Sequence, residues 1–161
     1  PWNDMDAPEL YELARDPRIG MLCGWKPYEC IDDAHSALST FLAAPDSYAV
    51  TLASTGEIAG SIALRIDTGS PEATVADIGY WIGAPYWGNG YATEAGHAII
   101  DRARELGVQM IVLKYFDGND ASQRVSEKLG FAWQSRDEDV EYPLIGKRLT
   151  VHRTELVLAG H

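Results

Sequence analysis

A glycine-rich turn at residues 86–94, which read YWGNGYATE, is the feature of the chain that could most readily bind an anion. A predicted helix follows directly, and the first turn of a helix presents N–H groups without partners and a partial positive charge. Gly90 and the small Ala92 would let a diphosphate approach this helix start closely. Gly88 and Gly90 can equally form a tight turn with no ligand. The segment alone leaves both interpretations open.

Two common nucleotide-binding motifs do not match this turn. A P-loop ends in Gly-Lys-Ser or Gly-Lys-Thr, and no such sequence occurs here. The dinucleotide fingerprint requires Gly or Ala five residues after the first glycine, where this chain has Thr93. The strands predicted before the turn also resemble antiparallel hairpins rather than a βαβ unit. A nucleotide-binding domain is therefore a distant alternative.

Charge and composition restrict the class of protein. The 161 residues suit one domain over residues 1–161, and 46% of them are apolar. The net charge of −11 disfavours nucleic acid as a partner and would attract cationic amines, or would simply keep the protein soluble. No apolar stretch approaches the roughly 20 residues of a membrane span, and no secretory leader is evident, so we expect a cytoplasmic protein. Cys23 and Cys30 lack a nearby histidine cluster, so we expect no metal.

The predicted elements run from helices to strands and then alternate. Helical spacing of apolar residues predicts helices over 6–16, 30–44, 91–106 and 119–130. The third of these would be capped by Gly107 and would bury Ala92, Ala95, Ile99, Ala103 and Leu106. Pro17 and Pro45 would end the first two, and Asn119 and Gly130 would cap the last. β-Branched and aromatic residues predict strands over 47–53, 57–66, 73–83, 108–116, 131–135 and 148–159, with turns at 54–56 and 67–72 and an acidic connection at 136–142. This order predicts an α+β fold, a mixed sheet with helices on both faces.

Three segments in order give a family resemblance. The segments ADIGYWIG (76–83), YWGNGYATEA (86–95) and NDASQRVSEKLGF (119–131) resemble the GNAT superfamily of acetyl-CoA-dependent N-acetyltransferases. They look most like the branch that acetylates the N-termini of ribosomal proteins. The family signature maps onto residues 87–92, with Trp87 in place of Arg or Gln. The resemblance implies a mostly antiparallel sheet in which parallel strands 73–83 and 108–116 splay apart around the pantetheine arm.

The resemblance also implies roles for individual residues in transfer from a thioester to an amine. The amine must be neutral, the oxyanion must be stabilised and the leaving thiolate needs a proton. The Ile82 N–H would meet the oxyanion, Asp77 would accept the amine proton through water, and Ser122 would assist the thiolate. Asp77 could instead simply face solvent, and Asn119 and Ser122 could simply cap their helix. Implied cofactor contacts are Ile82, Gly83, Trp87, Gly88, Asn89, Gly90, Tyr91, Ala92, Thr93, Asn119 and Ser122.

The acceptor is the least readable part of the sequence. Trp25, Tyr28 and Tyr80 could contact its apolar portion, and four acids (Asp137, Glu138, Asp139 and Glu141) could attract a cationic one or could simply be solvated. We expect direct transfer of acetyl from acetyl-CoA to a primary amine, either a protein N-terminus or a small molecule, in a ternary complex. Trp87, and Ser126 where many relatives have Tyr, keep a non-catalytic acyl-CoA-binding module open as the alternative. A homodimer also remains open.

Overall fold

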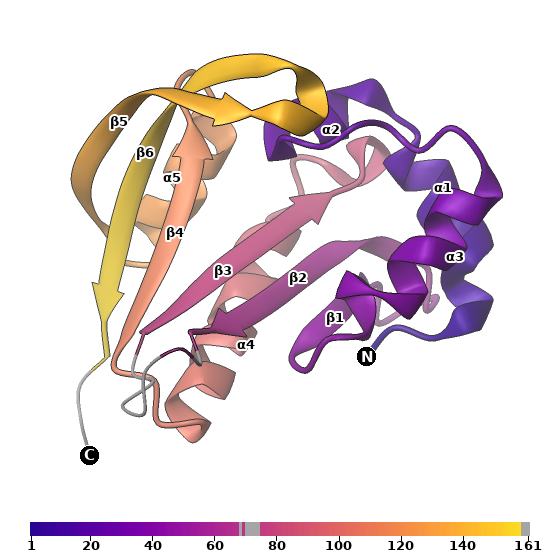
Figure 1. Ribbon diagram of the computed structural model, residues 1–161. Coiled ribbons are helices and arrows are strands. Elements are labelled where there is room, and N and C mark those ends of the chain that lie inside the picture. Colours follow the sequence, from indigo (N-terminus) through magenta and orange to yellow (C-terminus); the bar gives the residue numbers. More distant parts are fainter. Residues whose placement is uncertain (68, 70–74, 159–161) are drawn as a thin grey trace.

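One six-stranded sheet organises the molecule (Figure 1). The computed structural model describes residues 1–67, 69 and 75–158. The strand order is β1-β2-β3-β4-β6-β5, and β3–β4 is the parallel pair among antiparallel neighbours. The strands are β1 (Ser47–Thr51), β2 (Ile58–Ile66), β3 (Val75–Ile82), β4 (Met110–Phe116), β5 (Ala132–Tyr142) and β6 (Lys147–Val157). The predicted mixed, mostly antiparallel sheet is confirmed.

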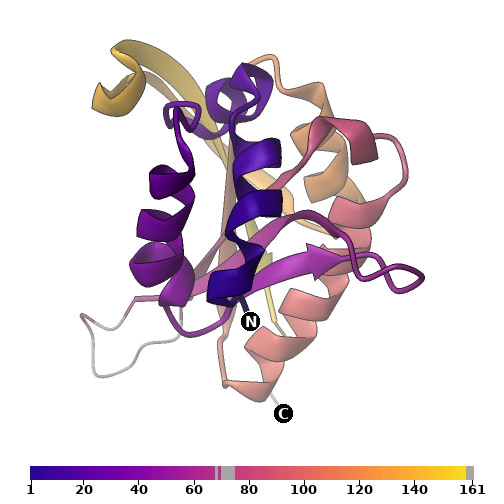
Figure 2. The ribbon, with the colours of Figure 1, turned by 90° about the vertical axis from the view of Figure 1, so that its right-hand side faces the viewer.

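Helices cover both faces of this sheet, as predicted (Figure 2). The α-helices are α1 (Ala7–Ala14), α2 (Pro17–Cys23), α3 (Ile31–Ser39), α4 (Tyr91–Glu105) and α5 (Asp120–Lys128). Short 3-10 turns are η1 (Asp4–Asp6), η2 (Phe41–Ala43), η3 (Ala84–Tyr86) and η4 (Pro143–Ile145). One core lies between the sheet and α4 and α5, and a second forms around α1 and α3 on the opposite face. In the described part of the chain, no helix has both the length and the apolar content to cross a bilayer.

The parallel strands β3 and β4 separate partway along their length. Their register pairs residues 75–78 with residues 110–113, and both strands continue beyond the last pair, Ile78 with Leu113. Figure 1 shows β3 and β4 diverging toward their C-terminal ends, while β6 stays beside β4. The predicted separation of the two strands is therefore present, and it leaves an opening in the middle of the sheet.

Helix boundaries in the N-terminal region differ from the prediction. The first predicted helix ends at Ala14, and Pro17 begins the separate helix α2. Proline suits the first position of a helix because its missing N–H would have no partner there, and Asp16 caps this start through the Arg18 N–H. The second predicted helix ends at Ser39 and is followed by η2, well before Pro45.

The acidic segment 136–142 was expected to be a connection, but it lies within β5. Its carboxylates occur beside arginines: Asp139 pairs with Arg148 on β6 at 2.7 Å, and Glu138 with Arg136 at 3.5 Å. Neutralising partners let acidic residues continue a strand that their composition disfavours. The predicted strand residues 73, 74 and 159, and most of the turn at 67–72, lie outside the described residues.

Helix α4 packs through a face slightly different from the predicted one. Its buried residues are Gly96, Ile99, Ile100 and Ala103, whereas Leu106, expected in the core, is 39% exposed. A Cβ on Gly96 would lie 2.5 Å from Leu129 Cδ1, so the absence of a side chain lets α5 approach α4 closely. The predicted end of the helix is confirmed, because Gly107 follows it at φ +77°.

Candidate active site

The glycine turn between β3 and α4 exposes backbone donors. Gly88 and Gly90 have φ values of +81° and +76°, a region that disfavours other residues. Gly90 is the N-cap of α4 and no side chain caps the helix start, so the first N–H groups of α4 keep their capacity to bind an anion. Asn89 holds the turn in shape, because its Nδ2 donates to the carbonyls of Tyr86 at 3.0 Å and Trp87 at 3.2 Å.

A cavity of about 480 Å³, called here the turn cavity, lies between this turn and α5. Residues 86–93 line one side, and Asn119, Ser122, Arg124 and Lys128 line the other. Sequence reasoning did not single out Arg124 and Lys128. These two residues are four apart and lie on the same face of α5 as Ala121 and Val125, which also line the cavity. The sequence could have shown that they share a helix face. Two cations thus face a helix start that favours anions.

A second cavity, of about 540 Å³, lies on the face of the sheet that carries α1 and α3, and is called here the sheet cavity. Its lining comes from each of the strands β1 to β6, from the segments around α2 and η2, and from the start of α5. Both cavities are lined by the same six residues at the opening between β3 and β4. These are Leu22, Cys23, Tyr80, Trp81, Asn119 and Ser122. The two cavities therefore meet at the opening of the sheet.

Tyr80 and Ser122 form a hydroxyl pair at this meeting point. The Tyr80 Oη and Ser122 Oγ atoms lie 2.7 Å apart, and Asn119 accepts a hydrogen bond from the Ser122 N–H at 3.2 Å. Asn119 is thus the helix cap that the sequence suggested, while the Ser122 hydroxyl remains directed at Tyr80. Burial raises the pKa of Tyr80, so its phenol stays protonated at neutral pH. Sequence reasoning placed Tyr80 with the acceptor and did not link it to Ser122.

Cys23 lies beside this pair as a neutral thiol. Its Sγ is 4.0 Å from the Tyr80 carbonyl oxygen, and burial raises its pKa to about 12. A nucleophilic cysteine needs the opposite shift, because the thiolate is the reactive form. The position therefore does not favour an acyl-enzyme intermediate on Cys23.

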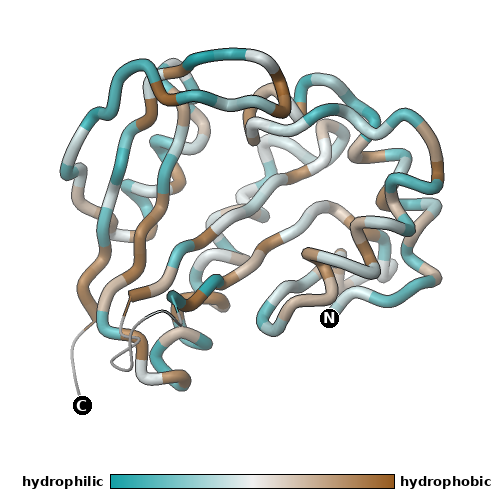
Figure 3. The backbone as a smooth tube through the Cα atoms, viewed as in Figure 1, coloured by the Kyte–Doolittle hydropathy of each residue, from teal (hydrophilic) through white to brown (hydrophobic). Residues whose placement is uncertain are grey.

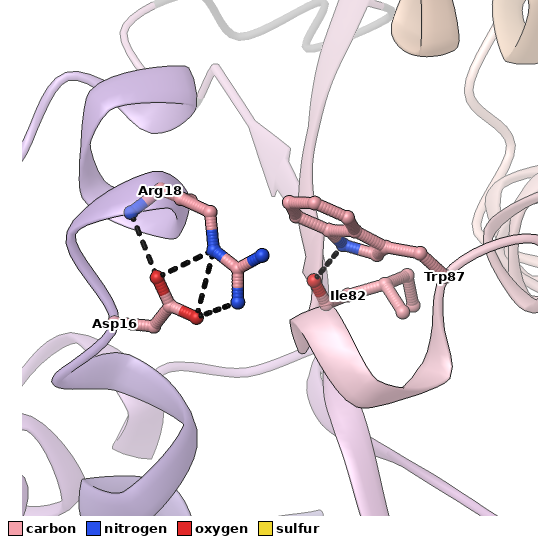
Figure 4. A network of polar contacts seen from close by, with 4 residues as sticks. All are labelled: Asp16, Arg18, Ile82 and Trp87. Carbon is pink, nitrogen blue, oxygen red and sulfur yellow. Dashed lines mark hydrogen bonds and ion pairs between the residues drawn. The ribbon is translucent and has the colours of Figure 1, made fainter.

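The peptide group of Ile82 faces the opening. Ile82 lies opposite Gly60 of β2, and the Gly83 N–H donates to the Ala59 carbonyl at 2.7 Å. This alternation directs the N–H and C=O of Ile82 away from β2, toward the side from which β4 has diverged. The Ile82 carbonyl accepts a hydrogen bond of 2.7 Å from Trp87 Nε1 (Figure 4). The N–H points into the same opening.

Trp87 also contacts α2. The Arg18 guanidinium carbon lies 5.3 Å from the centre of the Trp87 ring, within the range of a cation–π contact. Asp16 binds this guanidinium at 2.7 Å, and the Arg18 hydrogen bond lowers the pKa of the Asp16 carboxyl. Figure 4 shows Arg18 between Asp16 and Trp87. The tryptophan that replaces the usual Arg or Gln therefore connects the turn, the end of β3 and α2.

The structure brings two of the remaining predicted residues to the sheet cavity. Asp77 lines it with its side chain 43% exposed, 3.5 Å from Arg65 Nη2. Trp25 also lines it and packs edge-on against Trp81, with ring centres 6.2 Å apart. Tyr28 instead packs on the core around α1 and α3, where burial raises its pKa to about 12. Among the described residues, no cluster of three or more His, Cys, Asp or Glu side chains is arranged to hold a metal.

Comparisons with known proteins agree with the observed fold. One solved structure, an acetyltransferase (GNAT family) from Bacillus anthracis, matches with a TM-score of 0.85 and 18% identity, over 97% of this chain and 91% of that one. Another, the acetyltransferase MccE in complex with acetyl-CoA and AMP, gives a TM-score of 0.80 and 22% identity, over 97% and 89%. A ribosomal-protein-alanine N-acetyltransferase from Brucella melitensis gives 0.77 and 17%, over 98% and 97%. At these identities the likeness shows the fold.

The sequence itself matches relatives and a family. The uncharacterized protein YkkB of Bacillus subtilis is 38% identical over 79 residues, which are 47% of this chain and 44% of that protein. The uncharacterized N-acetyltransferase YoaA of the same organism is 27% identical over 80% of this chain and 75% of its own. The chain thus spans less than half of YkkB. Residues 1–132 match the family described as acetyltransferase (GNAT) domain. Because this match covers most of the sequence, the chain belongs to the GNAT acetyltransferase family.

Proposed function

We propose that this protein transfers an acetyl group from acetyl-CoA directly to a primary amine, within a ternary complex. One observation carries the proposal: the turn cavity and the sheet cavity meet at the Tyr80–Ser122 hydroxyl pair, within the opening between β3 and β4. A thioester that enters from one cavity and an amine that enters from the other would react at this point. Holding both reactants in contact supplies a large part of the rate enhancement.

Acetyl-CoA suits the turn cavity. The N–H groups at the start of α4 would bind the diphosphate, with Gly88 and Gly90 leaving the backbone open and Arg124 and Lys128 adding positive charge. The pantetheine arm would then follow the opening between the strands, past Asn119. The structural neighbour MccE was solved in complex with acetyl-CoA, which supports acetyl-CoA as the ligand of a protein with this fold.

The attack itself would take place at the opening between β3 and β4, on the side of the sheet cavity. The amine nitrogen attacks the thioester carbonyl, and the Ile82 N–H would donate to the resulting oxyanion. Asp77 would accept the proton that the amine loses, through a water molecule, because its carboxylate lines the same cavity. An α-amine, with a pKa of about 8, needs less help than a lysine at about 10.4.

The hydroxyl pair would serve the leaving group. As the carbon–sulfur bond breaks, Ser122 would donate a hydrogen bond and a proton to the thiolate, and Tyr80 would replace that proton across their 2.7 Å contact. The Tyr80 phenol is a stronger acid than the Ser122 hydroxyl. Tyr80 would then regain a proton from solvent, to which Asp77 would release the proton that the amine lost. A tyrosine from β3 would thus do what a tyrosine at position 126 does in many relatives, where this chain has the buried Ser126.

The acceptor remains a choice between a protein N-terminus and a small-molecule amine. The resemblance of the motifs to the ribosomal-protein branch supports the first, and a structural neighbour at 17% identity bears that branch's name. The sheet cavity, with its aromatic walls, supports the second.

Calorimetric titration with acetyl-CoA tests the proposal first, with ATP and NAD as controls. We expect saturable binding of acetyl-CoA alone, followed by release of free CoA thiol when a suitable amine is added. Absence of acetyl-CoA binding by folded protein would overturn the proposal. Binding without turnover on any amine would instead indicate a non-catalytic acyl-CoA-binding module.

A further inference from the structure

The sheet cavity has a charge opposite to that of the whole molecule. The protein carries a net charge of −11, yet this cavity is lined by the cations Arg65 and Lys114. Asp77 is the one carboxylate among its lining residues in the described part of the chain. A positive cavity within an acidic protein is a local feature that the composition does not explain.

The two cations lie close to the opening of the sheet. Arg65 is paired in register with Asp77, and a Cβ on Gly79 would lie 2.8 Å from Arg65 Nη2. The missing side chain of Gly79 thus makes room for the guanidinium to lie along β3 toward the opening. Lys114 follows Leu113, the last residue of β4 that pairs with β3. Both side chains therefore flank the space where an acceptor would reach the thioester.

Lys114 is available for a ligand. Among the described residues, no carboxylate lies within ion-pair distance of its ammonium group. Its neighbour across β6 is Arg153, which Glu155 already binds at 2.9 Å, and Arg65 contacts Asp77 at the longer distance of 3.5 Å. The nearby carboxylates are thus engaged with arginines, which leaves Lys114 with a positive charge to offer.

The floor and the walls of the cavity indicate the shape of its ligand. Small residues, among them Ser47, Ser61 and Ala63, form the floor. The walls are aromatic: Trp25, Trp81, Phe116 and Tyr142.

We propose that the sheet cavity is an acceptor subsite for an amine that carries its own carboxylate, an amino acid with an apolar or aromatic side chain. Lys114 binds the carboxylate, Arg65 assists, and the aromatic walls hold the side chain while the amine faces the opening. This assignment rests on the acetyltransferase function proposed above. It reverses the expectation of a cationic acceptor drawn to the acids at 137–141, because Asp139 and Glu138 pair with arginines on the β5–β6 hairpin.

The cations act on the amine as well as on the carboxylate. Positive charge near an ammonium group lowers its pKa and so increases the fraction of neutral nucleophile. That effect alone would favour every amine equally. Recognition of a carboxylate is therefore distinguished only by comparing acceptors that differ in this group and in nothing else.

Matched acceptor pairs provide the test. The free acids and the amides of L-phenylalanine, L-leucine, L-methionine and L-tryptophan are compared by kcat/KM for CoA release, after acetyl-CoA binding has been measured. We expect the best free acid to exceed its amide by roughly tenfold to a hundredfold, the range of a charged hydrogen bond. The comparison is conservative, because a carboxylate favours the ammonium form of its own amine.

Variants locate the effect. Lys114→Met should remove most of the preference for the free acid while leaving the Kd for acetyl-CoA unchanged, and Lys114→Arg should keep it. Arg104→Met is the matched control, because it removes the same charge from the far end of α4, where Arg104 pairs with Asp101. The control should retain the preference of the unmodified protein.

Three results would overturn the subsite. These are amides that react as well as the acids, a preference that survives Lys114→Met, or acetyl-CoA binding with no acetylation of any member of the set. The last result would leave the proposed acetyltransferase function standing, with a larger acceptor such as a protein N-terminus. Failure of acetyl-CoA to bind would remove both proposals together.

Discussion

The two cavities that meet at Tyr80 and Ser122 differ in the groups that would bind a ligand, which are backbone N–H groups in one and side chains in the other. The turn cavity depends on backbone N–H groups at the start of α4, which one short segment supplies. The sheet cavity depends on side chains from the six strands β1 to β6 and from segments around α2, η2 and the start of α5. Where backbone groups bind the ligand, most substitutions leave binding unchanged unless the new side chain is large enough to block the ligand. Where side chains bind the ligand, each substitution alters the binding surface. The difference explains why the sequence predicts a cofactor for the turn, whereas it leaves the class of acceptor open.

The largest expected effect comes from adding bulk and charge to the backbone-built site. Ala92→Glu places a carboxylate on the first turn of α4, where the diphosphate would lie. Repulsion between like charges a few ångströms apart should weaken acetyl-CoA binding by at least about a hundredfold. Ala98→Glu, at an exposed position of the same helix, is the matched control and should bind normally. Calorimetry measures both, and unchanged affinity in Ala92→Glu would refute the phosphate site.

Removing the hydroxyl at the meeting point should affect turnover rather than binding. Ser122→Ala is expected to lower kcat by roughly a hundredfold, in the range of lost general acid catalysis, with a small change in the Kd for acetyl-CoA. Tyr80→Phe should lower kcat by a similar factor. The two losses should not add in the double variant, because both hydroxyls would serve one proton path.

A control separates this effect from general damage. Tyr11→Phe removes a phenol on the α1 side of the molecule, where Tyr11 donates to the Glu29 carbonyl, and it should leave kcat unchanged. Turnover at the unmodified rate in Ser122→Ala would reduce Ser122 to a residue of the helix start. Additive losses in the double variant would show that Tyr80 does not act through Ser122 on the thiolate.

Much of the fold was predictable because its signals are local. Apolar periodicity and caps such as Asn119 and Gly107 located α4 and α5 correctly. The start of α2 was missed although its signal, Pro17 after the Asp16 cap, is local. Two other errors arose where a distant partner decides the structure. Asp139 lies within β5, where its side chain pairs with Arg148 of β6, and Leu106 is exposed while Gly96 packs against Leu129 at the end of α5. No local pattern contains those partners.

The site follows the same division. The glycine turn, Asn119 and Ser122 were found from short motifs, whereas the contact between Tyr80 and Ser122 spans 42 residues of sequence. Arg65 and Lys114 come together only because β2, β3 and β4 are neighbours in the sheet. Arg124 and Lys128 are an intermediate case, since helical spacing put them on one face but only the fold shows what that face meets.

A smaller effect is expected from the base proposed in the side-chain-built site. Asp77→Asn should lower kcat/KM by about tenfold near neutral pH, because water at a neutral amide accepts the amine proton less well. Glu155→Gln removes a carboxylate from β6 of the same sheet and should leave kcat/KM unchanged. An unchanged kcat/KM in Asp77→Asn would remove Asp77 as the base.

The smallest effect should come from Trp87, which connects the glycine turn with the end of β3. Trp87→Phe keeps an aromatic ring for Arg18 to stack on but removes the Nε1 hydrogen bond to the Ile82 carbonyl. A single hydrogen bond contributes about 1 kcal/mol, so we expect a three- to tenfold fall in kcat/KM. Because the bond orients the Ile82 peptide, whose N–H would meet the oxyanion, the loss should fall on kcat more than on the Kd for acetyl-CoA. Arg18→Gln, which keeps the indole bond, should leave kcat unchanged. A change confined to Kd would instead make Trp87 part of the turn that binds the cofactor, with no influence on the end of β3.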